Sequence, residues 1–288
     1  MSKVRPELIE LYNRLDKTLD DSRLQAQDKR HSKGNRTARE NLSDLIDKNS
    51  FIEFGQLAVA AQRNRRNYEE LQDATAADGV LTGLCTINKD NIGLNNAHAI
   101  AIINDYSVLA GTQGFFHHKK LDRMLELADR YLLPVIMYTE GGGGRPGDTD
   151  VKTQIAGLNI TSFASWARLK GKVPRISVNN GYCFAGNAAL FGSADFCIAT
   201  KNSWIGMAGP AMIEGGGLGL FKPSEIGPSD LQEKNGVIDF VAKDEEHATQ
   251  VAKKLLSYFQ GKQEHWSIVD QESLNNSIPE NRRMAYPV

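Results

Sequence analysis

Short apolar runs alternate with amphipathic segments through most of the chain. Apolar runs rich in β-forming residues predict strands, here at residues 51–57, 79–87, 91–103, 106–111, 133–139, 173–178, 194–199, 204–205 and 238–241. Apolar side chains at helical spacing predict helices at residues 116–131, 150–169, 184–192 and 245–258. From residue 116 onward, helices and strands follow one another in turn. This order predicts an α/β fold with a parallel sheet.

The N-terminal region has a different, strongly charged pattern. Its apolar residues recur at near-helical spacing, at Leu8, Ile9, Leu11, Leu15 and Leu19. We therefore expect an amphipathic helix over residues 1–30 that packs on a neighbouring domain or subunit. A second helix is predicted over residues 37–47, because Thr37 and Glu40 have the spacing of a capping box.

The most informative feature is a run of four glycines, Gly141–Gly144, which follows the predicted strand at residues 133–139 and precedes Arg145. Glycines cost backbone entropy and bring no side-chain contacts. They suit a place where bare N–H groups approach a ligand closely, for example to hold an oxyanion. A flexible linker would also use glycine, but linkers usually carry Ser or Pro and lie between domains.

A second glycine- and alanine-rich stretch, residues 179–189, also follows a predicted strand and opens a helix. The N-terminus of a helix has unpaired N–H groups and a partial positive potential. In a parallel sheet both stretches open at the same edge, so their N–H groups could converge into an oxyanion hole. Close packing of a helix on a sheet also selects Gly and Ala, and it is the alternative interpretation.

Two further segments are candidates for binding. A third glycine cluster, residues 207–219, contains Gly209 and Pro210, and its composition suits a loop that forms the wall of an apolar pocket. The dense basic cluster at residues 117–120 lies close to a glycine-rich turn at residues 111–114. Its lysines could contact phosphates, or the cluster could be the solvated start of a helix.

Composition narrows the function classes. The 288 residues include 34 basic and 35 acidic side chains, and the net charge of −1 argues against a general nucleic-acid binder. Cys85, Cys183 and Cys197 lack metal-type spacing and lie in apolar surroundings, which predicts buried thiols in a reducing cytosol. Neither a signal peptide nor an apolar run of membrane-spanning length is found, so we expect a soluble cytoplasmic protein.

The usual catalytic side chains are sparse. The six histidines show no metal-binding spacing, and no nucleophile elbow, P-loop or dinucleotide motif occurs in a suitable context. We therefore expect no metal, and a chemistry that relies on backbone N–H groups rather than on a side-chain nucleophile.

Six segments in register resemble the N-terminal half of the carboxyltransferase component of biotin-dependent acyl-CoA carboxylases, in the crotonase superfamily. They are residues 33–40, 50–55, 78–83, 141–145, 181–186 and 236–246. For example, residues 78–83 (DGVLTG) resemble the family's Asp-Gly-Val-Val-Thr-Gly, and residues 141–145 (GGGGR) stand where the family has Ser-Gly-Gly-Ala-Arg. The resemblance covers about residues 5–288.

The resemblance implies a crotonase-like ββα spiral that binds an acyl-CoA. It implies carboxyl transfer between carboxybiotin and the acyl α-carbon, with an enolate held by backbone N–H groups. Gly142 and Gly143 match the family's oxyanion glycines, and Ala185 and Gly186 occupy the second such position. The positions we expect to bind substrate are Gly111, Thr112, Lys119, Gly141, Gly144, Arg145, Gly209 and Pro210.

The resemblance also implies partners: a biotin carboxyl carrier protein, a biotin carboxylase, a second carboxyltransferase lobe and further copies of this chain. The expected organisation is a helical extension over residues 1–50, a single carboxyltransferase lobe over 51–262 and a tail over 263–288 toward a missing second lobe. We therefore expect a split subunit or a truncated piece, which can bind CoA without turnover.

Two alternatives remain open. One is a stand-alone crotonase-type acyl-CoA decarboxylase or hydrolase, which would need an acid or base; the candidates are Glu140, Asp148 and Glu214. The other is a non-catalytic CoA-binding module. Gly141 and Gly144 replace the family's Ser and Ala, and residues 146–148 also depart from its pattern, so the preference for acyl-chain length can differ.

Overall fold

The computed structural model describes residues 5–151 and 160–261. Within them the main sheet has, from edge to edge, the strands β1 (Ile52–Glu53), β2 (Val80–Thr86), β3 (His98–Asn104), β4 (Val135–Tyr138), β5 (Arg175–Asn179), β7 (Phe196–Thr200) and β9 (Phe240–Ala242). β1, β2 and β3 pair antiparallel, and β3 through β9 pair parallel. A separate parallel pair is formed by β6 (Tyr182–Phe184) and β8 (Trp204–Gly206). The mixed α/β fold with a parallel sheet is confirmed.

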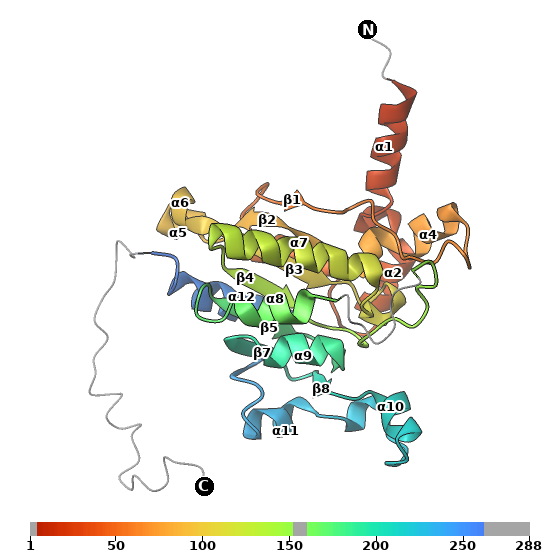
Figure 1. The fold of residues 1–288 in the computed structure, drawn as a ribbon. Coiled ribbons are helices and arrows are strands. Elements are labelled where there is room, and N and C mark those ends of the chain that lie inside the picture. Colours follow the sequence, from red (N-terminus) through yellow and green to blue (C-terminus); the bar gives the residue numbers. More distant parts are fainter. Residues whose placement is uncertain (1–4, 152–159, 262–288) are drawn as a thin grey trace, which may run out of the picture.

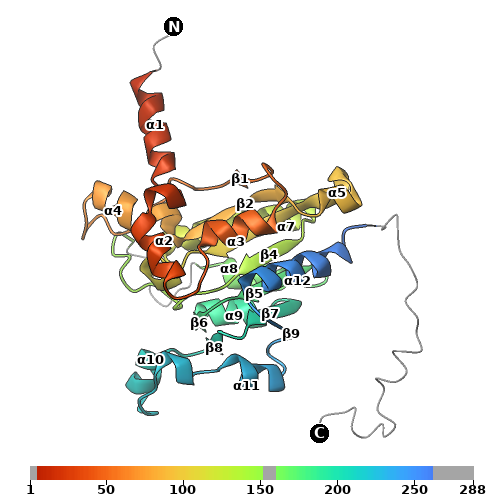
Figure 2. The ribbon, with the colours of Figure 1, turned by 180° about the vertical axis from the view of Figure 1, so that it is seen from behind.

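Helices cover both faces of the sheet (Figures 1 and 2). In chain order the α-helices are α1 (Pro6–Asp16), α2 (Leu24–His31), α3 (Ala38–Leu45), α4 (Tyr68–Ala74), α5 (Lys89–Ile92), α6 (Leu94–Ala97), α7 (Phe115–Tyr131), α8 (Ser162–Arg168), α9 (Gly186–Gly192), α10 (Pro210–Gly215), α11 (Ser229–Lys234) and α12 (Glu245–Ser257). Helices α7, α8 and α9 lie on one face, and α3 and α12 lie on the other.

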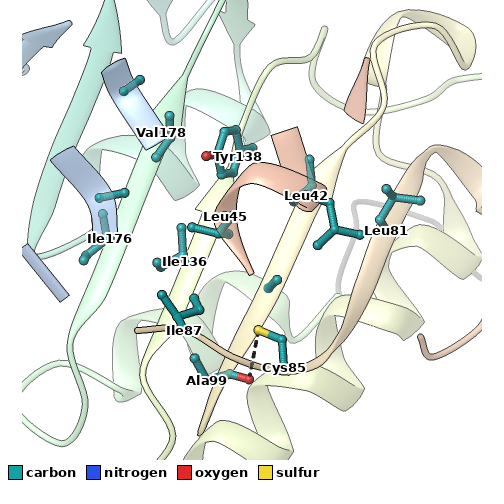
Figure 3. Packing of buried hydrophobic residues seen from close by; sticks show 14 of the residues in the cluster. Leu42, Leu45, Leu81, Cys85, Ile87, Ala99, Ile136, Tyr138, Ile176 and Val178 are labelled. Carbon is teal, nitrogen blue, oxygen red and sulfur yellow. Dashed lines mark hydrogen bonds between the residues drawn. The ribbon is translucent and has the colours of Figure 1, made fainter. Parts of the chain in front are cut away.

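Alternation along the strands produces these two cores. On β3, Ile100 and Ile102 point toward α7, whereas Ala101 and Ile103 point toward α3 and α12. Figure 3 shows the second core, where Leu45 of α3 packs beside Ile136 of β4. Helix α3 therefore belongs to the same hydrophobic core as the sheet, although it precedes the first strand.

The capping box of the N-terminal region is confirmed. The Thr37 hydroxyl accepts from the Glu40 N–H, and the Glu40 carboxylate accepts from the Thr37 N–H, so α3 begins as predicted. The single helix over residues 1–30 is wrong. It is broken into α1, a short 3-10 turn and α2, because the backbone at Leu19 is extended. α1 buries none of its residues and stands away from the body of the protein (Figure 1).

One predicted strand is only partly correct, and another is wrong. Of the strand predicted over residues 91–103, the part from His98 onward is confirmed as β3. The segment before His98 forms α5 and α6 instead, because β2 ends at Thr86, opposite His98, and leaves no partner for an earlier strand. Residues 106–111 form a turn and a 3-10 helix, η3 (Leu109–Gly111). This turn is fixed by Asp105, whose carboxylate accepts from the Ser107 N–H at 2.9 Å.

Other predicted elements are shorter than expected. The strand over residues 51–57 is reduced to β1, and of the helix over 150–169 the structure describes only α8, because residues 152–159 lie outside the described part. The predicted tail at 263–288 lies outside it as well.

The predicted burial of all three cysteines is confirmed, and burial raises the pKa of each thiol to about 12. Among the described helices, none has the length and apolar character needed to cross a membrane.

Candidate active site at the carboxyl edge of the sheet

The loops that follow β3, β4 and β5 meet at one edge of the sheet, as the parallel arrangement predicts. The Gly141 N–H donates to the Tyr182 carbonyl oxygen at 2.7 Å, and the Phe184 N–H donates to the Gly141 carbonyl oxygen at 2.9 Å. The Gly142 N–H donates to the carbonyl oxygen of Ala110 at 3.0 Å. Backbone hydrogen bonds therefore hold the first glycine stretch between its two neighbours.

The backbone of these loops is strained. Leu109, Ala110 and Gly111 have consecutive φ values of 48°, 56° and 62°, in the region that residues with a Cβ atom rarely adopt. Ala185 has φ 50° and ψ −119°, a conformation typical of glycine. Strained backbone clusters at functional sites because the surrounding structure must hold it there. The observed strain therefore supports this edge as the functional region.

Three of the four amides predicted to be catalytic donate within the protein. The Gly142 N–H is engaged as described above. The Gly143 N–H donates to the Oδ1 atom of Asn187 at 2.9 Å, and the Ala185 N–H donates to the Gly206 carbonyl oxygen at 3.0 Å. These bonds fix the loops, and they leave the three N–H groups unavailable to a ligand in this conformation.

Among the accessible amides of the glycine stretches, those of Gly144 and Gly186 have no such partner. Within the described residues, the N–H groups of Gly144 and Gly186 donate no hydrogen bond to the protein. Gly144 is exposed and Gly186 is half-buried, so both amides are accessible. Amide donors that are held by rigid neighbours and lack an acceptor can stabilise a carbonyl oxygen or an oxyanion.

Arg145 supports the glycine loop from inside the protein. Its guanidinium forms an ion pair with Asp78, lies 3.5 Å from Asp148 and donates to the Thr112 carbonyl oxygen at 2.7 Å. Only 3% of the Arg145 side chain and none of the Asp78 side chain is exposed. These contacts occupy the guanidinium, so Arg145 braces the loop in this structure.

The other predicted binding positions lie in different places. Gly111 and Thr112 end the strained turn beside the glycine loop. Lys119 lies on the exposed side of α7, where its Nζ atom is 5.5 Å from the centre of the Phe115 ring. Gly209 and Pro210 start α10. None of the predicted catalytic or substrate-binding positions is among the residues that line the cleft described next.

A cleft of about 1120 Å³ opens at this edge of the sheet. Its lining includes Glu140, which precedes the first glycine-rich stretch, and Gly181, which lies within the second. One wall consists of α2 and the turn after it, which contribute Ala26, Lys29 and Lys33. The cleft therefore brings the N-terminal region against the candidate site, which the sequence did not indicate.

Aromatic side chains form another part of the cleft lining. The Tyr182 ring lies 4.8 Å from the Trp204 ring and 6.5 Å from the Tyr106 ring, measured between ring centres, and all three line the cleft. A cleft lined by both flat aromatic rings and cationic lysines suits a ligand that combines a planar or apolar part with negative charge.

An ion pair joins α2 to Glu140 in the cleft lining. Arg30 donates to both carboxylate oxygens of Glu140, at 2.9 and 2.8 Å, and its Nε atom donates to the Arg36 carbonyl oxygen at 2.9 Å. Burial raises the pKa of Glu140 to about 7, and the neighbouring Arg30 limits the rise.

Of the other two candidate acids, Asp148 is buried beside Arg145, and Glu214 is exposed on α10.

Sequence reasoning missed Arg30, Asn187 and the aromatic part of the cleft lining. Tyr182 gave a local signal, because it stands inside the second glycine-rich stretch. Arg30 gave none, because its partner Glu140 is 110 residues away. Among the described residues, no group of three or more His, Cys, Asp or Glu side chains is arranged to hold a metal ion.

Fold and loop geometry together define a crotonase-like α/β protein, and comparisons with known proteins agree. The carboxyl transferase domain family matches residues 29–288, and the chain belongs to this family. A solved single-chain, multi-domain long-chain acyl-CoA carboxylase superposes with a TM-score of 0.89 at 50% identity, over 98% of this chain and 28% of that one.

Curated relatives point to the same family. The methylmalonyl-CoA carboxyltransferase 12S subunit of Propionibacterium freudenreichii subsp. shermanii is 31% identical over 89% of this chain and 46% of its own length. A solved transcarboxylase 12S structure, a hexamer with methylmalonyl-CoA bound, has a TM-score of 0.68 at 30% identity, over 85% of this chain and 45% of that one. The methylmalonyl-CoA decarboxylase subunit alpha of Veillonella parvula is 27% identical over 99% of this chain and 56% of its own length. The chain thus spans about half the length of these curated relatives.

Proposed function

We propose that this chain is the acyl-CoA-binding lobe of a biotin-dependent carboxyltransferase, which moves a carboxyl group between carboxybiotin and the α-carbon of an acyl-CoA. The observation that carries the proposal is the deep cleft beside two glycine-rich loops in a member of the carboxyl transferase domain family. The cationic residues of α2 suit the phosphates of CoA, and the aromatic part of the cleft lining suits its adenine or its acyl chain.

On this proposal, backbone amides of the lobe stabilise the negative charge that develops on the thioester oxygen during the reaction. The α-carbon of a thioester becomes nucleophilic when it loses a proton and the carbonyl oxygen gains negative charge. Donors that are already oriented stabilise that charge without reorganisation. The amides of Gly144 and Gly186 are free to do so, whereas three of the four predicted amides, those of Gly142, Gly143 and Ala185, are engaged within the protein.

Carboxybiotin supplies the carboxyl group, and the biotin nitrogen can accept the α-proton. Its ureido oxygen needs hydrogen-bond donors of its own. The free amides of Gly144 and Gly186 can serve one carbonyl oxygen. We therefore expect donors for biotin from a second lobe or subunit, and delivery of biotin by a carrier protein that a biotin carboxylase loads. A cytoplasmic location and homo-oligomers remain predictions.

One observation favours the alternative of a stand-alone decarboxylase or hydrolase. Glu140 lies in the cleft, and its pKa of about 7 suits a general acid or base near neutral pH. However, Arg30 binds both carboxylate oxygens, so Glu140 would have to leave this ion pair to exchange a proton with a ligand. Turnover of an acyl-CoA in the absence of any biotin compound would establish this alternative and overturn carboxyl transfer.

The acyl-CoA site is tested by filling the cleft. Ala26 faces the cleft from α2, and Trp at this position occupies the space without disturbing the main core. Ala164, an exposed residue of α8, provides a matched control for the same substitution. Calorimetric titration with acetyl-CoA, longer acyl-CoAs and free CoA should show binding to the natural chain and to Ala164→Trp. Affinity should be lost or fall at least tenfold in Ala26→Trp.

Equal binding by both Trp variants would move the acyl-CoA site out of the cleft. No binding of any CoA compound to the natural chain would contradict a CoA-binding lobe. Carboxyl transfer itself is tested by adding a complementary second lobe and biotin, with incorporation of labelled carboxyl groups as the measurement. Tight CoA binding without any transfer under those conditions would favour the non-catalytic CoA-binding module.

A further inference from the structure

One buried side chain touches all three loops of the candidate site. Asn187, the second residue of α9, is fully buried. Its Oδ1 atom accepts from the Gly143 N–H at 2.9 Å, and its Nδ2 atom lies 3.4 Å from the Gly111 carbonyl oxygen. A Cβ atom at Gly141 would collide with that same Nδ2 atom. The carboxamide thus fills the space where the strained turn, the glycine loop and α9 come together.

We propose that Asn187 is a positioning residue that decides which backbone amides a thioester oxygen can use. It holds the Gly143 N–H inside the protein and so orients the glycine loop with the Gly144 N–H free. This inference rests on the proposed function, because it presumes that an acyl-CoA binds beside these loops. It goes further by naming the side chain that keeps the Gly143 N–H from the carbonyl oxygen and leaves the Gly144 N–H free for it.

The physical reason is competition for one proton donor. A thioester oxygen that took the Gly143 N–H would leave the buried Oδ1 atom of Asn187 without a partner, and an unpaired buried acceptor is costly. The fit is also tight: a Cβ atom at Gly143 would lie 2.7 Å from the Cβ atom of Ala185. Because Gly143 has a φ of +88°, the loop is held in a conformation that favours glycine.

Recognition of the carbonyl oxygen can be measured separately from CoA binding. An acyl-CoA and the S-alkyl-CoA of equal chain length differ only in the thioester carbonyl group. The ratio of their dissociation constants, measured by calorimetry on the full chain, reports what the amide donors contribute. We expect the natural chain to prefer the thioester about tenfold, as one or two hydrogen bonds would provide.

Substitution of Asn187 should change this ratio. Asn187→Ala removes the acceptor that fixes the loop, so the preference for the thioester should fall about three- to tenfold. Binding of the S-alkyl-CoA should change little. Asn41→Ala is the matched control: Asn41 is equally buried, but its carboxamide bonds Glu245 at 2.6 Å, so the ratio should remain that of the natural chain.

Other outcomes separate the possibilities. A ratio that rises in Asn187→Ala would show that Gly143 is a ligand donor with which Asn187 competes, and would overturn the inference. An unchanged ratio, or equal loss for both ligands, would reduce Asn187 to a purely structural role. If the natural chain binds neither the acyl-CoA nor the S-alkyl-CoA, the result contradicts the proposed function as well as the inference. If it binds both equally, only the inference fails.

A second measurement needs no substitution. In the natural chain, the backbone N–H signals of Gly143, Gly144 and Gly186 can be followed by nuclear magnetic resonance during titration with the matched pair of ligands. The thioester should shift the signals of Gly144 and Gly186 more than the S-alkyl compound does. The Gly143 signal should respond equally to both. A thioester-specific shift at Gly143 alone would contradict the assignment.

Discussion

Two regions of this chain join a glutamate to consecutive glycines, and they behave in opposite ways. The enclosed glycine loop, residues 140–145, begins with the buried Glu140 and lies between the loops after β3 and β5. The exposed glycine segment, residues 214–219, begins with the exposed Glu214 at the end of α10. A Cβ atom at Gly141 would collide with its neighbours, whereas one at Gly215 would meet nothing within 4 Å.

This difference shows that glycine content alone does not identify a site. At Gly141 of the enclosed loop, glycine is required because the Gly111 carbonyl oxygen and the Asn187 carboxamide occupy the space of a side chain. In the exposed segment, the same residue type provides only backbone freedom. The useful signal is the position of the glycines directly after a buried strand of a parallel sheet, which brings them against the loops of adjacent strands.

The largest effect should come from the buried brace of the enclosed loop. Arg145→Met leaves the fully buried Asp78 without its ion-pair partner, so the free energy of unfolding should fall by about 3–5 kcal/mol. Arg123→Met removes the exposed pair with Glu126 and should cost less than about 1 kcal/mol. Urea denaturation of both variants measures the difference. Equal, small losses would mean that the brace contributes little.

A pH series tests the two glutamates. The folded pKa of Glu140 is about 7, above its ordinary value of 4.5, so the folded state binds the proton more tightly than the unfolded state. The contribution of Glu140 to the free energy of unfolding should therefore fall as pH rises from 4.5 to 7, by up to about 3 kcal/mol.

This contribution is isolated by comparing the natural chain with Glu140→Gln in urea denaturation between pH 5 and pH 8. The difference between the two unfolding free energies should change across this range. Glu214→Gln, the counterpart in the exposed segment, should follow the profile of the natural chain. A constant difference for Glu140→Gln would show that Arg30 keeps Glu140 ionised throughout.

Substituting one glycine of each region by alanine should change the stability of the fold by a smaller amount, and the two changes should have opposite signs. Gly141→Ala forces a methyl group against the Gly111 carbonyl oxygen and should destabilise the fold by about 1–3 kcal/mol. Gly215→Ala, in α10, should be neutral or stabilise by about 0.5–1 kcal/mol. Thermal unfolding of the two variants provides the comparison. A Gly141→Ala protein as stable as the natural chain would contradict the close packing seen here.

The smallest expected effect concerns the lysines. Lys29→Ala and Lys33→Ala should each weaken acyl-CoA binding about two- to fivefold at low salt, and less at high salt, because both residues are exposed. Lys119→Ala should leave the affinity unchanged, since Lys119 does not line the cleft. Calorimetry at two salt concentrations is the measurement. The reverse order of effects would place the phosphates on the outer side of α7.

The sequence predicted the sheet and its main helices well, because their apolar periodicity is strong. Two of the three loops at the carboxyl edge, those after β4 and β5, were located from glycines that follow buried strands. The prediction was wrong at residues 106–111, where a polar side chain, Asp105, fixes a turn within an apolar run. Local patterns carry no information on such a bond until the partners are placed in space.

The site was predicted less completely than the fold. Periodicity cannot distinguish an arginine that binds a ligand from one that braces a loop, and the burial of Arg145 follows only from the position of Asp78. Likewise, whether an amide is free depends on its acceptor. Asn187 lies 44 residues after Gly143, and no spacing rule connects the two.

The ion pair between Arg30 and Glu140 also bears on the order of folding. It joins residues 110 positions apart, across β2, β3 and α7. Contacts of such high sequence separation close large loops of chain, and they form late relative to local helices and hairpins. We therefore expect the wall of the cleft to assemble after the sheet, so that a partly folded chain has a core before it has a binding site.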